Sequence, residues 1–425
     1  MLAAFAIALQ FPDLTPLGNG QKALFDSYQR VVHSYHKHLA PRKREVAPVV
    51  IVQIDEASLK KIGQWPWPRN RTAELIEAIA AMQPLAIGLD MYMPEPDMTS
   101  PGAVADNLPK GEDKLGTALR KLPAHDDRLA AALRRGPTVL GAAGFDFETL
   151  STSSGLRTLP LHVEGGDAGP WLRRYPFVLA SLPELQAAAR GQALLSVDLD
   201  DGIVRRIPLI AAVNDQVVPS LAMEMLRVAT DSAAVEVRVG RRGIEEVRVG
   251  DLAVPTQENG EIWLHFVGAT GDRYVSAADV LAGRADPEMF ENKLVLVGLT
   301  GMGLSDMRTT AINEQVPGID IQAQVLERLF EGRLLLRPAW MLWIEIALLF
   351  VGGFFLVWAV PNMKPRIATG LATMISVVLF GAGFVLFLAT GLLLDAASVF
   401  AGLNVVFGSL LSAVFIEADQ QRLDA

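Results

Sequence analysis

The sequence predicts an α/β domain built on a mixed, partly parallel sheet, followed by a bundle of three transmembrane α-helices. Two observations carry this prediction. Short apolar runs bounded by turn residues alternate with helical patterns over most of the chain. After Trp340, three apolar stretches of about 20 residues or more follow one another, and each is long enough to cross a bilayer. These stretches also explain why 51% of the 425 residues are hydrophobic, too many for one ordinary soluble domain.

Charge and composition exclude several classes of protein. The formal net charge is -9 and no basic face is evident, so we expect no nucleic-acid partner. The chain contains no cysteine, which excludes disulfides, thiolate chemistry and sulfur-ligated zinc. The compartment must therefore be inferred from the membrane topology.

The N-terminal residues 1–19 predict a partial membrane segment. The run "MLAAFAIALQF" is too short to span a bilayer and lacks the basic start and cleavage site of a signal peptide. We expect it to be the outer half of a span whose beginning is missing or shortened. Helical spacing over residues 21–39 then predicts an amphipathic helix. Its histidines favour a solvated face over a metal site, because only His33 and His36 have facing spacing.

Residues 20–337 form the predicted α/β domain. Four apolar runs read as buried strands: 49–55, 85–90, 138–145 and 293–301. The helical patterns cover 72–82, 219–229, 276–283 and 319–332. Turn residues predict one hairpin within 193–213, joined at Asp201-Gly202, and a second within 240–250. Together they predict a mixed sheet with helices on both faces.

Two aspartates follow predicted strands. Asp55 precedes "EASLKKIG", a short helix that Gly63 would end, so the carboxylate is a natural N-cap. Asp90 ends the strand 85–90 in the same way. Since ligands in open α/β sheets bind at the carboxyl ends of strands, two acids at adjacent strand ends are also candidate Mg²⁺ ligands. Capping and ligand binding both remain open.

The segment "GQWPWPR" alternates aromatic residues with proline. The prolines predict an extended run in which Trp65 and Trp67 project to opposite sides. Arg69 or Arg71 would then stack on one indole and reach Asp90, forming a cation–π clamp beside a carboxylate. The alternative is that the two aromatic rings only pack.

Two further motifs are weak. "DLDDG" at 198–202 lacks the frame and the closing glutamate of a calcium loop, and "GLTGMGLSD" at 298–306 lacks the Gly-Lys-Ser/Thr of a phosphate loop. No nucleophile elbow or zinc-protease helix is present in the sequence. We therefore expect no catalytic set, metal site or cofactor in this chain.

Residues 338–417 carry the predicted spans, at about 340–360, 367–389 and 396–416. Lys364 and Arg366 lie in the first connector and Asp395 in the second, so the positive-inside rule places the first connector in the cytoplasm. The α/β domain is then outside the cytoplasmic membrane, and residues 418–425 begin a cytoplasmic tail. Glu345 lies within the first span. Its side chain either extends to water at the outer end or has a function in the membrane.

Several sequence blocks resemble one known family. The blocks are "VVIVQIDEASLKKIGQWPWPR", "AIGLDMYMPEPD", "VDLDDGIVRRIPL" with "PSLAMEML", and "KLVLVGLTGMGLSD" followed by "VPGIDIQAQVLERLFEG". Their order and spacing resemble the type-two CHASE domain, an extracellular sensory domain of bacterial signalling proteins. Two positions depart from the family pattern: Gln322 stands where a histidine is common, and the usual proline shortly after Asp306 is absent.

The resemblance implies a receptor that detects an extracytoplasmic stimulus or protein partner and works as a homodimer or higher homo-oligomer in the lipid bilayer. It implies a cytoplasmic output, most often a class III nucleotidyl cyclase and otherwise a kinase, so we expect this chain to be the truncated, non-enzymatic part of such a receptor. The motif positions that it offers as ligand-binding or framework residues are Asp55, Trp65, Trp67, Arg69, Asp90, Asp198, Gly202, Arg205 and Asp306. A Mg²⁺-dependent hydrolase using Asp55, Asp90 and Asp306, and a structural oligomerisation domain, are the alternatives.

Overall fold

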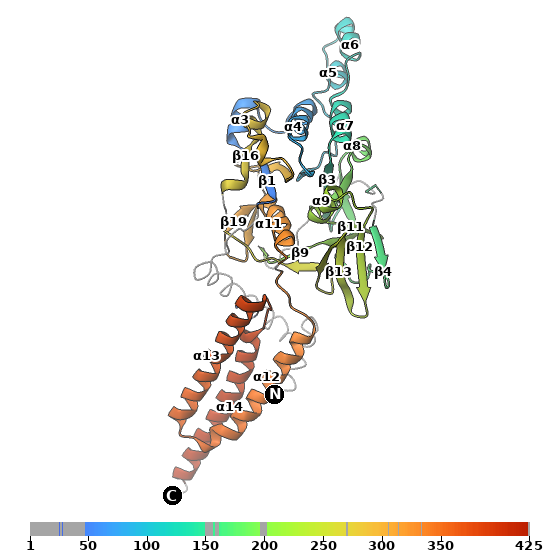
Figure 1. The fold of residues 1–425 in the computed structure, drawn as a ribbon. Helices are drawn as coiled ribbons and strands as arrows, with labels where there is room; N and C mark the ends of the chain where they lie inside the picture. The colour runs from blue at the N-terminus through green and yellow to red at the C-terminus, as the bar shows by residue number, and fades with distance from the viewer. Residues whose placement is uncertain are drawn as a thin grey trace. The chain divides into compact units, whose positions relative to one another are not determined.

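The computed structural model describes residues 25, 28, 47–148, 156–157, 161–195, 202–268, 271–304, 306–312, 314–332 and 334–423. The chain divides into two compact units, which we describe separately. The α/β unit comprises Lys43–Thr310 and Glu314–Leu334, and the helical unit is built from the chain after Leu335. Figure 1 shows both units as a ribbon and labels many of their elements.

The main sheet of the α/β unit has seven strands and is mostly parallel, which confirms the predicted fold class. Its order is β16-β1-β17-β2-β3, with β7 pairing in parallel with β3 and β6 pairing antiparallel with the end of β3. The strands are β1 (Val49–Ile54), β2 (Ala86–Leu89), β3 (Thr138–Phe145), β6 (Phe177–Leu179), β7 (Gly191–Leu194), β16 (Tyr274–Ser276) and β17 (Leu294–Leu299). All four strands predicted from apolar runs are present.

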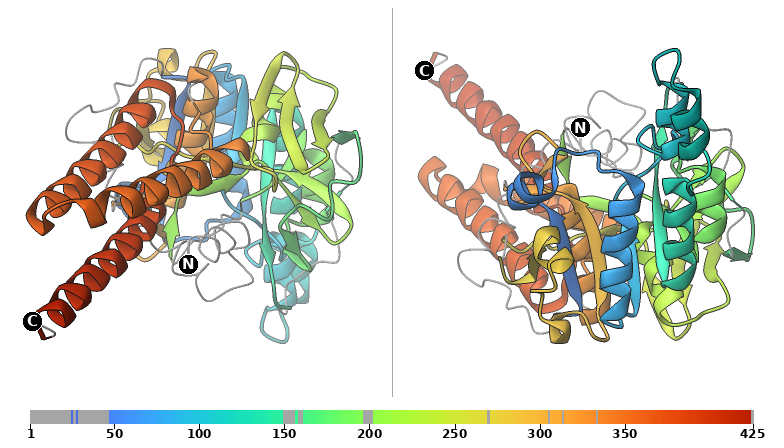
Figure 2. Two further views of the ribbon diagram at one scale, coloured as in Figure 1. Left: turned by 90° about the horizontal axis from the view of Figure 1, so that it is seen from below. Right: turned by 90° about the horizontal axis from the view of Figure 1, so that it is seen from above.

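Helices cover both faces of this sheet, as its continuous apolar strands require. On one face Ile87 and Leu89 pack in a core with α4 (Arg69–Ala81), α7 (His125–Arg135), α8 (Pro183–Ala188) and α10 (Ala277–Leu281). On the other face lie α9 (Leu221–Ala229) and α11 (Gly318–Glu331); Gly88, between those two core residues, faces Met225 of α9. Figure 2 shows α4 and α7 side by side.

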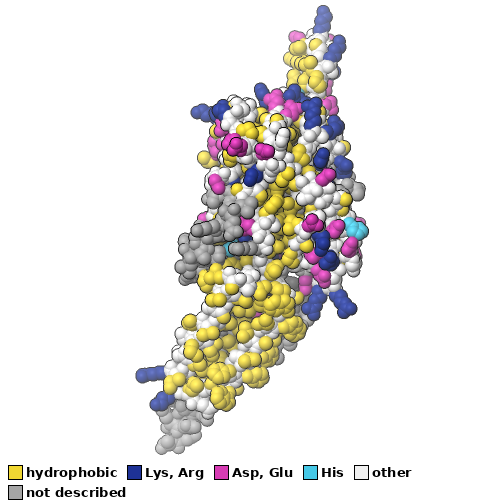
Figure 3. All heavy atoms as spheres, viewed as in Figure 1, with side chains coloured by type: hydrophobic (Ala, Val, Ile, Leu, Met, Phe, Trp, Pro, Cys, Tyr) yellow, Lys and Arg dark blue, Asp and Glu magenta, His cyan; other side chains and the backbone are white. Residues whose placement is uncertain are grey.

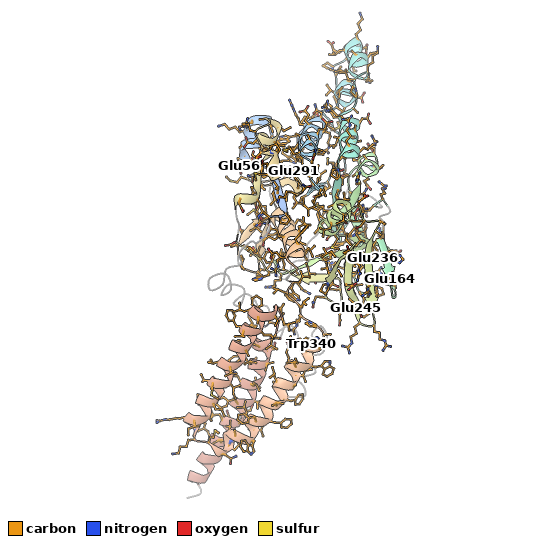
Figure 4. The ribbon with its side chains drawn as sticks, viewed as in Figure 1. Glu56, Glu164, Glu236, Glu245, Glu291 and Trp340 are labelled. Atoms are coloured by element: carbon orange, nitrogen blue, oxygen red, sulfur yellow. The ribbon has the colours of Figure 1, made fainter. Side chains whose placement is uncertain are left out.

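Smaller sheets complete the α/β unit. The strands of the four-stranded sheet are β14 (Leu252–Pro255), β13 (Gly243–Val249), β12 (Val235–Gly240) and β4 (Leu161–Glu164). Figure 4 labels Glu164, Glu236 and Glu245 on three of these neighbouring strands. The others are β5 (Arg174–Tyr175), β8 (Ile203–Val204), β9 (Arg206–Pro208), β10 (Ile210–Val213), β11 (Gln216–Pro219), β15 (Glu261–Trp263), β18 (Met307–Thr310) and β19 (Gln315–Pro317). The remaining short helices are α3 (Glu56–Ile62), α5 (Pro101–Asp106) and α6 (Asp113–Leu119).

One hairpin prediction is confirmed and the other is wrong. β12 and β13 pair antiparallel around Arg241-Arg242 as predicted within 240–250. Of the described residues on either side of Asp201-Gly202, β7 and β8 do not pair with each other: β7 joins β3 in the main sheet and β8 joins β18 elsewhere. The antiparallel pair in this region is β10 with β11. A turn signal alone did not reveal that the flanking strands have long-range partners.

The helical unit contains three helices long and apolar enough to cross a membrane, as predicted. They are α12 (Trp340–Ala359), α13 (Pro365–Thr390) and α14 (Ala396–Leu423). Figure 3 shows an almost wholly hydrophobic surface over them, in contrast to the mixed charges over the α/β unit. Trp340, labelled in Figure 4, lies in the first turn of α12, where an aromatic ring favours a membrane interface.

Candidate functional site: a pocket at the carboxyl ends of the parallel strands

A pocket of about 750 Å³ lies where four parallel strands of the main sheet end. Asp90 follows β2, Leu299 ends β17, Phe145 ends β3 and Leu195 follows β7, and all four residues line it. This is the edge at which open α/β sheets bind their ligands, and the volume is that of a small-molecule site. We call it the strand-end pocket. Its lining also includes Trp65, Met91, Tyr92, Ala143, Gly144, Asp146, Arg173, Tyr175, Leu304, Asp306, Arg308, Gly318, Ile319 and Gln322.

Asp90 is the most perturbed acid in this pocket. Its backbone N–H continues the strand by donating to Val297 at 2.9 Å, which fixes the position of the side chain. Within the described part of the chain its carboxylate has no hydrogen-bond or ion-pair partner. Burial, with a contribution from the negative charge of Asp306, raises the pKa of Asp90 to about 7. The group therefore changes charge close to neutral pH.

The two guanidinium groups of the pocket are both paired with carboxylates. Arg308 donates from Nε to Asp306 Oδ2 at 2.8 Å. Arg173 donates from Nη2 to Asp146 Oδ2 at 2.6 Å, and its Cζ lies 5.5 Å from the centroid of the Tyr175 ring. Neither guanidinium forms a hydrogen bond or an ion pair with Asp90.

The first turn of α11 forms another wall of the pocket. Gly318, Ile319 and Gln322 line it, and Ile319 packs so closely over Gly298 that a Cβ there would lie 2.5 Å from its Cδ1. The same Cβ would lie 3.3 Å from Asp90 Cβ, so Asp90 and Ile319 flank one glycine of β17. Gln322 is 3% exposed, and its Oε1 has no hydrogen-bond partner among the described residues. Because this oxygen has almost no accessible surface, it does not offer an acceptor to a ligand in the pocket.

Asp55 lies outside this pocket and acts as the N-cap of α3. Its Oδ1 accepts hydrogen bonds from Ser58 N at 2.9 Å, Ser58 Oγ at 2.6 Å and Ser276 Oγ at 2.9 Å. The expectation that Asp55 and Asp90 follow adjacent strands was wrong, because β17 lies between β1 and β2. Of the three acids assigned to a hydrolase, the pocket contains only Asp90 and Asp306. No group of three or more acidic or histidine side chains in the described ranges is arranged to hold a metal ion.

Trp65 and Trp67 do not project to opposite sides, so the predicted extended run was wrong. Their ring centroids lie 5.7 Å apart in an edge-to-face contact, and the Trp65-Pro66 peptide bond is cis. The segment turns because it joins two consecutive helices, α3 and α4. Trp67 belongs to the core and donates from Nε1 to Gly63 O at 2.8 Å, whereas Trp65 lines the strand-end pocket.

The predicted clamp between an arginine and Asp90 was also wrong. Arg69 begins α4, where its backbone N–H donates to Asp97 Oδ2 at 2.7 Å and its Nε lies 3.7 Å from Asp126 Oδ1. Arg71 pairs with Glu74 on the helix surface. Arg69 therefore ties the start of α4 to the loop after β2 and to α7.

Two other predicted positions are not among the described pocket residues. Asp198 lies outside the described residues. Arg205 is 3% exposed between β8 and β9, where its carbonyl accepts from Leu264 N at 3.0 Å. It is not among the residues that line the pocket. The predicted helix over 21–39, with its histidines, likewise falls almost wholly outside the described residues.

Sequence reasoning did not identify Tyr92, Asp146, Arg173 or Arg308 as pocket residues. Tyr92 and Asp146 follow β2 and β3, Arg173 directly precedes β5, and Arg308 lies in β18. Only the long-range pairing of the chain brings these segments together. Gln322 did carry a signal, because it departs from the family pattern within α11.

Glu345 does not extend to water, so that expectation was wrong. It is fully buried in the helical unit, where Arg337 donates from Nη1 to Oε1 at 2.7 Å and from Nη2 to Oε2 at 2.9 Å. The backbone N–H of Asp395 also donates to Oε1, at 2.8 Å. Arg337 Nη1 reaches the Leu393 carbonyl, and Asp395 Oδ1 accepts from Ser398 N in α14. The acid therefore joins α12 to the connector before α14.

Comparison with known proteins decides the family. The model of the CHASE2 domain matches residues 1–360, well over half of the chain. The chain belongs to the CHASE2 domain family. CHASE2 is a sensor domain rather than a catalytic one, and together with the three apolar helices it indicates a membrane signalling receptor. No curated protein and no solved structure matches the chain.

Proposed function

We propose that this CHASE2 chain is the sensory part of a bacterial transmembrane receptor and that its stimulus is a small molecule bound in the strand-end pocket. The observation that carries the proposal is the pocket itself, about 750 Å³ at the carboxyl ends of β17, β2, β3 and β7. A sensor domain needs a site for its stimulus, and this volume and position are typical of ligand sites in α/β proteins.

The proposed topology has the α/β unit outside the cytoplasmic membrane. Lys364 directly precedes α13 and Arg366 lies in its first turn, and the positive-inside rule favours the cytoplasm for this end of the helix. With three spans, the end of α14 then lies in the cytoplasm. We propose that a nucleotidyl cyclase, or alternatively a kinase, receives the signal there.

The connectivity of α11 supports a route from the pocket to the membrane. The first turn of α11 lines the pocket, Gly332 ends the helix in a left-handed conformation, and α12 begins at Trp340. One short stretch of chain therefore joins a pocket wall to the first span. A ligand shifts the receptor only if it binds two conformations with different affinity, and a homodimer would convert such a shift into a change between two output halves.

The experiment that tests this function is a thermal-stability screen of the full chain in detergent micelles against small metabolites. A compound at one hundred times its Kd adds about 2.7 kcal/mol to the free energy of unfolding. We expect hits that disappear in Leu304→Trp, in which a larger side chain fills the pocket from a partly buried loop position.

The matched control is Met302→Trp, on the same loop. Met302 is 86% exposed and is not among the residues that line the pocket. Hits that survive in both variants would place the binding elsewhere and overturn the proposed site.

A further inference from the structure

The charges that line the strand-end pocket are unequal. Its lining includes the carboxylates of Asp90, Asp146 and Asp306 but only two guanidinium groups, those of Arg173 and Arg308. Each arginine is already paired with a carboxylate, as described above. An anionic ligand would have to share a guanidinium with its carboxylate and would lie in the same pocket as Asp90. The arrangement disfavours an anion.

One acceptor in the pocket has no donor within the described residues, the carboxylate of Asp90. Ile319 of α11 packs over the same glycine of β17 beside it. A partly buried acceptor without a donor costs free energy that a ligand donor would recover.

Aromatic side chains form much of the remaining wall. Trp65, Tyr92, Phe145 and Tyr175 line the pocket, and Tyr92 is 40% exposed. Aromatic faces attract cations, and together with a carboxylate they recognise ammonium groups. They also offer apolar surface to the body of an organic ligand.

We infer that the strand-end pocket binds a small organic cation whose ammonium group pairs with Asp90 and lies against the aromatic side chains of the pocket. This inference rests on the proposed function, since it names the ligand class of the same site. The cation supplies the positive partner that the Asp90 carboxylate lacks among the described residues. Its apolar part packs against the aromatic wall.

The test uses the full chain in detergent micelles and four probes. They are 2-phenylethylammonium, its neutral counterpart 2-phenylethanol, the anion 3-phenylpropanoate, and tetramethylammonium, which has a permanent charge and no N–H donor. At pH 8 we expect both cations to bind more tightly than the alcohol and the anion. Asp90→Asn weakens cation binding roughly tenfold, as expected for the loss of a charge-assisted pair.

One further measurement separates binding from a structural effect. Between pH 6 and pH 8 the affinity for tetramethylammonium rises about tenfold in the wild type, because Asp90 ionises over this range, and stays constant in Asp90→Asn. The other charged groups that line the pocket, Asp146, Arg173, Asp306 and Arg308, are the same in both proteins.

Asp215→Asn is the matched control, because this acid is fully exposed and does not line the pocket. The inference is overturned if neither cation binds, or if the anion or the alcohol binds as tightly as the cations. If the anion or the alcohol binds the wild type but not Leu304→Trp, the strand-end pocket is still the ligand site and only the proposed ligand class is wrong. If no compound of the metabolite screen is sensitive to Leu304→Trp, the proposed function itself fails.

Discussion

Two acids in different units of this protein have opposite surroundings. Glu345 in the helical unit is completely buried, and both of its carboxylate oxygens accept hydrogen bonds, from Arg337 and from the Asp395 backbone. Asp90 in the α/β unit is partly buried and lines the strand-end pocket. Its carboxylate accepts no hydrogen bond from the described residues. Both were candidates for function on sequence grounds, and only their partners distinguish them.

The difference shows which acid holds the fold and which is open to a ligand. A buried carboxylate with a bidentate arginine has satisfied its charge within the protein, so its removal harms the protein itself. A carboxylate that lacks a partner lowers the free energy of unfolding of the ligand-free protein. A ligand that donates a hydrogen bond to this carboxylate would recover that free energy. Mutations of the two acids should therefore have opposite effects on the free energy of unfolding.

The largest effect is expected for Glu345→Ala. The substitution leaves the Arg337 guanidinium without its carboxylate in a largely buried position and removes the acceptor of the Asp395 N–H. Breaking a buried ion pair in this way costs about 3 kcal/mol of unfolding free energy. The change in the free energy of unfolding is measured by denaturant unfolding of the full chain in detergent micelles, followed by the circular dichroism signal of the helices.

The control for this prediction is Arg366→Ala, an exposed charge in the first turn of α13. It should change the free energy of unfolding by less than about 0.5 kcal/mol. If the Glu345 and Arg366 variants are equally stable, the ion pair does not stabilise the helical unit and the contrast with Asp90 disappears.

A smaller effect of opposite sign is expected for Asp90→Asn, and it depends on pH. The pKa of Asp90 is about 7 in the folded protein, against about 4 in an unfolded chain, so between these values the folded state keeps a proton that the unfolded state has lost. Wild-type stability relative to Asp90→Asn is therefore highest below pH 4 and falls as the pH rises to about 7. At pH 8 the free energy of unfolding of the variant should exceed that of the wild type by about 2 kcal/mol. This is roughly half of what the pKa difference would give in a site closed to water, because water in the pocket screens the charge.

Thermal melting of both proteins from pH 4.5 to pH 8.5, without ligand, measures this difference. Asp215→Asn should follow the wild type at every pH, because its side chain is fully exposed. A constant difference between wild type and Asp90→Asn across the range would contradict the raised pKa.

Local sequence patterns were sufficient to predict most elements of the fold. β1, β2, β3 and β17 are buried on both faces, so each appears as a continuous apolar run. The order of these strands did not follow from the patterns. β17, the last of the four in sequence, inserts between β1 and β2, and no local signal encodes a pairing between strands more than 200 residues apart.

The candidate site was predicted only in part for the same reason. Asp90, Trp65 and Asp306 were chosen from motifs, and all three line the pocket. Asp55 was placed beside Asp90 on the assumption that strands near in sequence are neighbours in the sheet. The ion pairs Arg173–Asp146 and Arg308–Asp306, which decide the charge balance, depend on side-chain contacts that periodicity does not reveal.

The smallest effect separates the N-cap from the pocket. Asp55→Ala removes the acceptor of Ser58 N and of two serine hydroxyls, and the loss of such a cap costs about 1 to 2 kcal/mol. Asp55→Asn, which keeps a capping oxygen, should cost clearly less. Because Asp55 does not line the strand-end pocket, neither substitution should change the affinity of a compound whose binding is lost in Leu304→Trp. If Asp55→Ala abolished that binding while the protein stayed folded, the segment around α3 would have to belong to the ligand site. Asp55 would then bind the ligand as Asp90 does, instead of only capping α3.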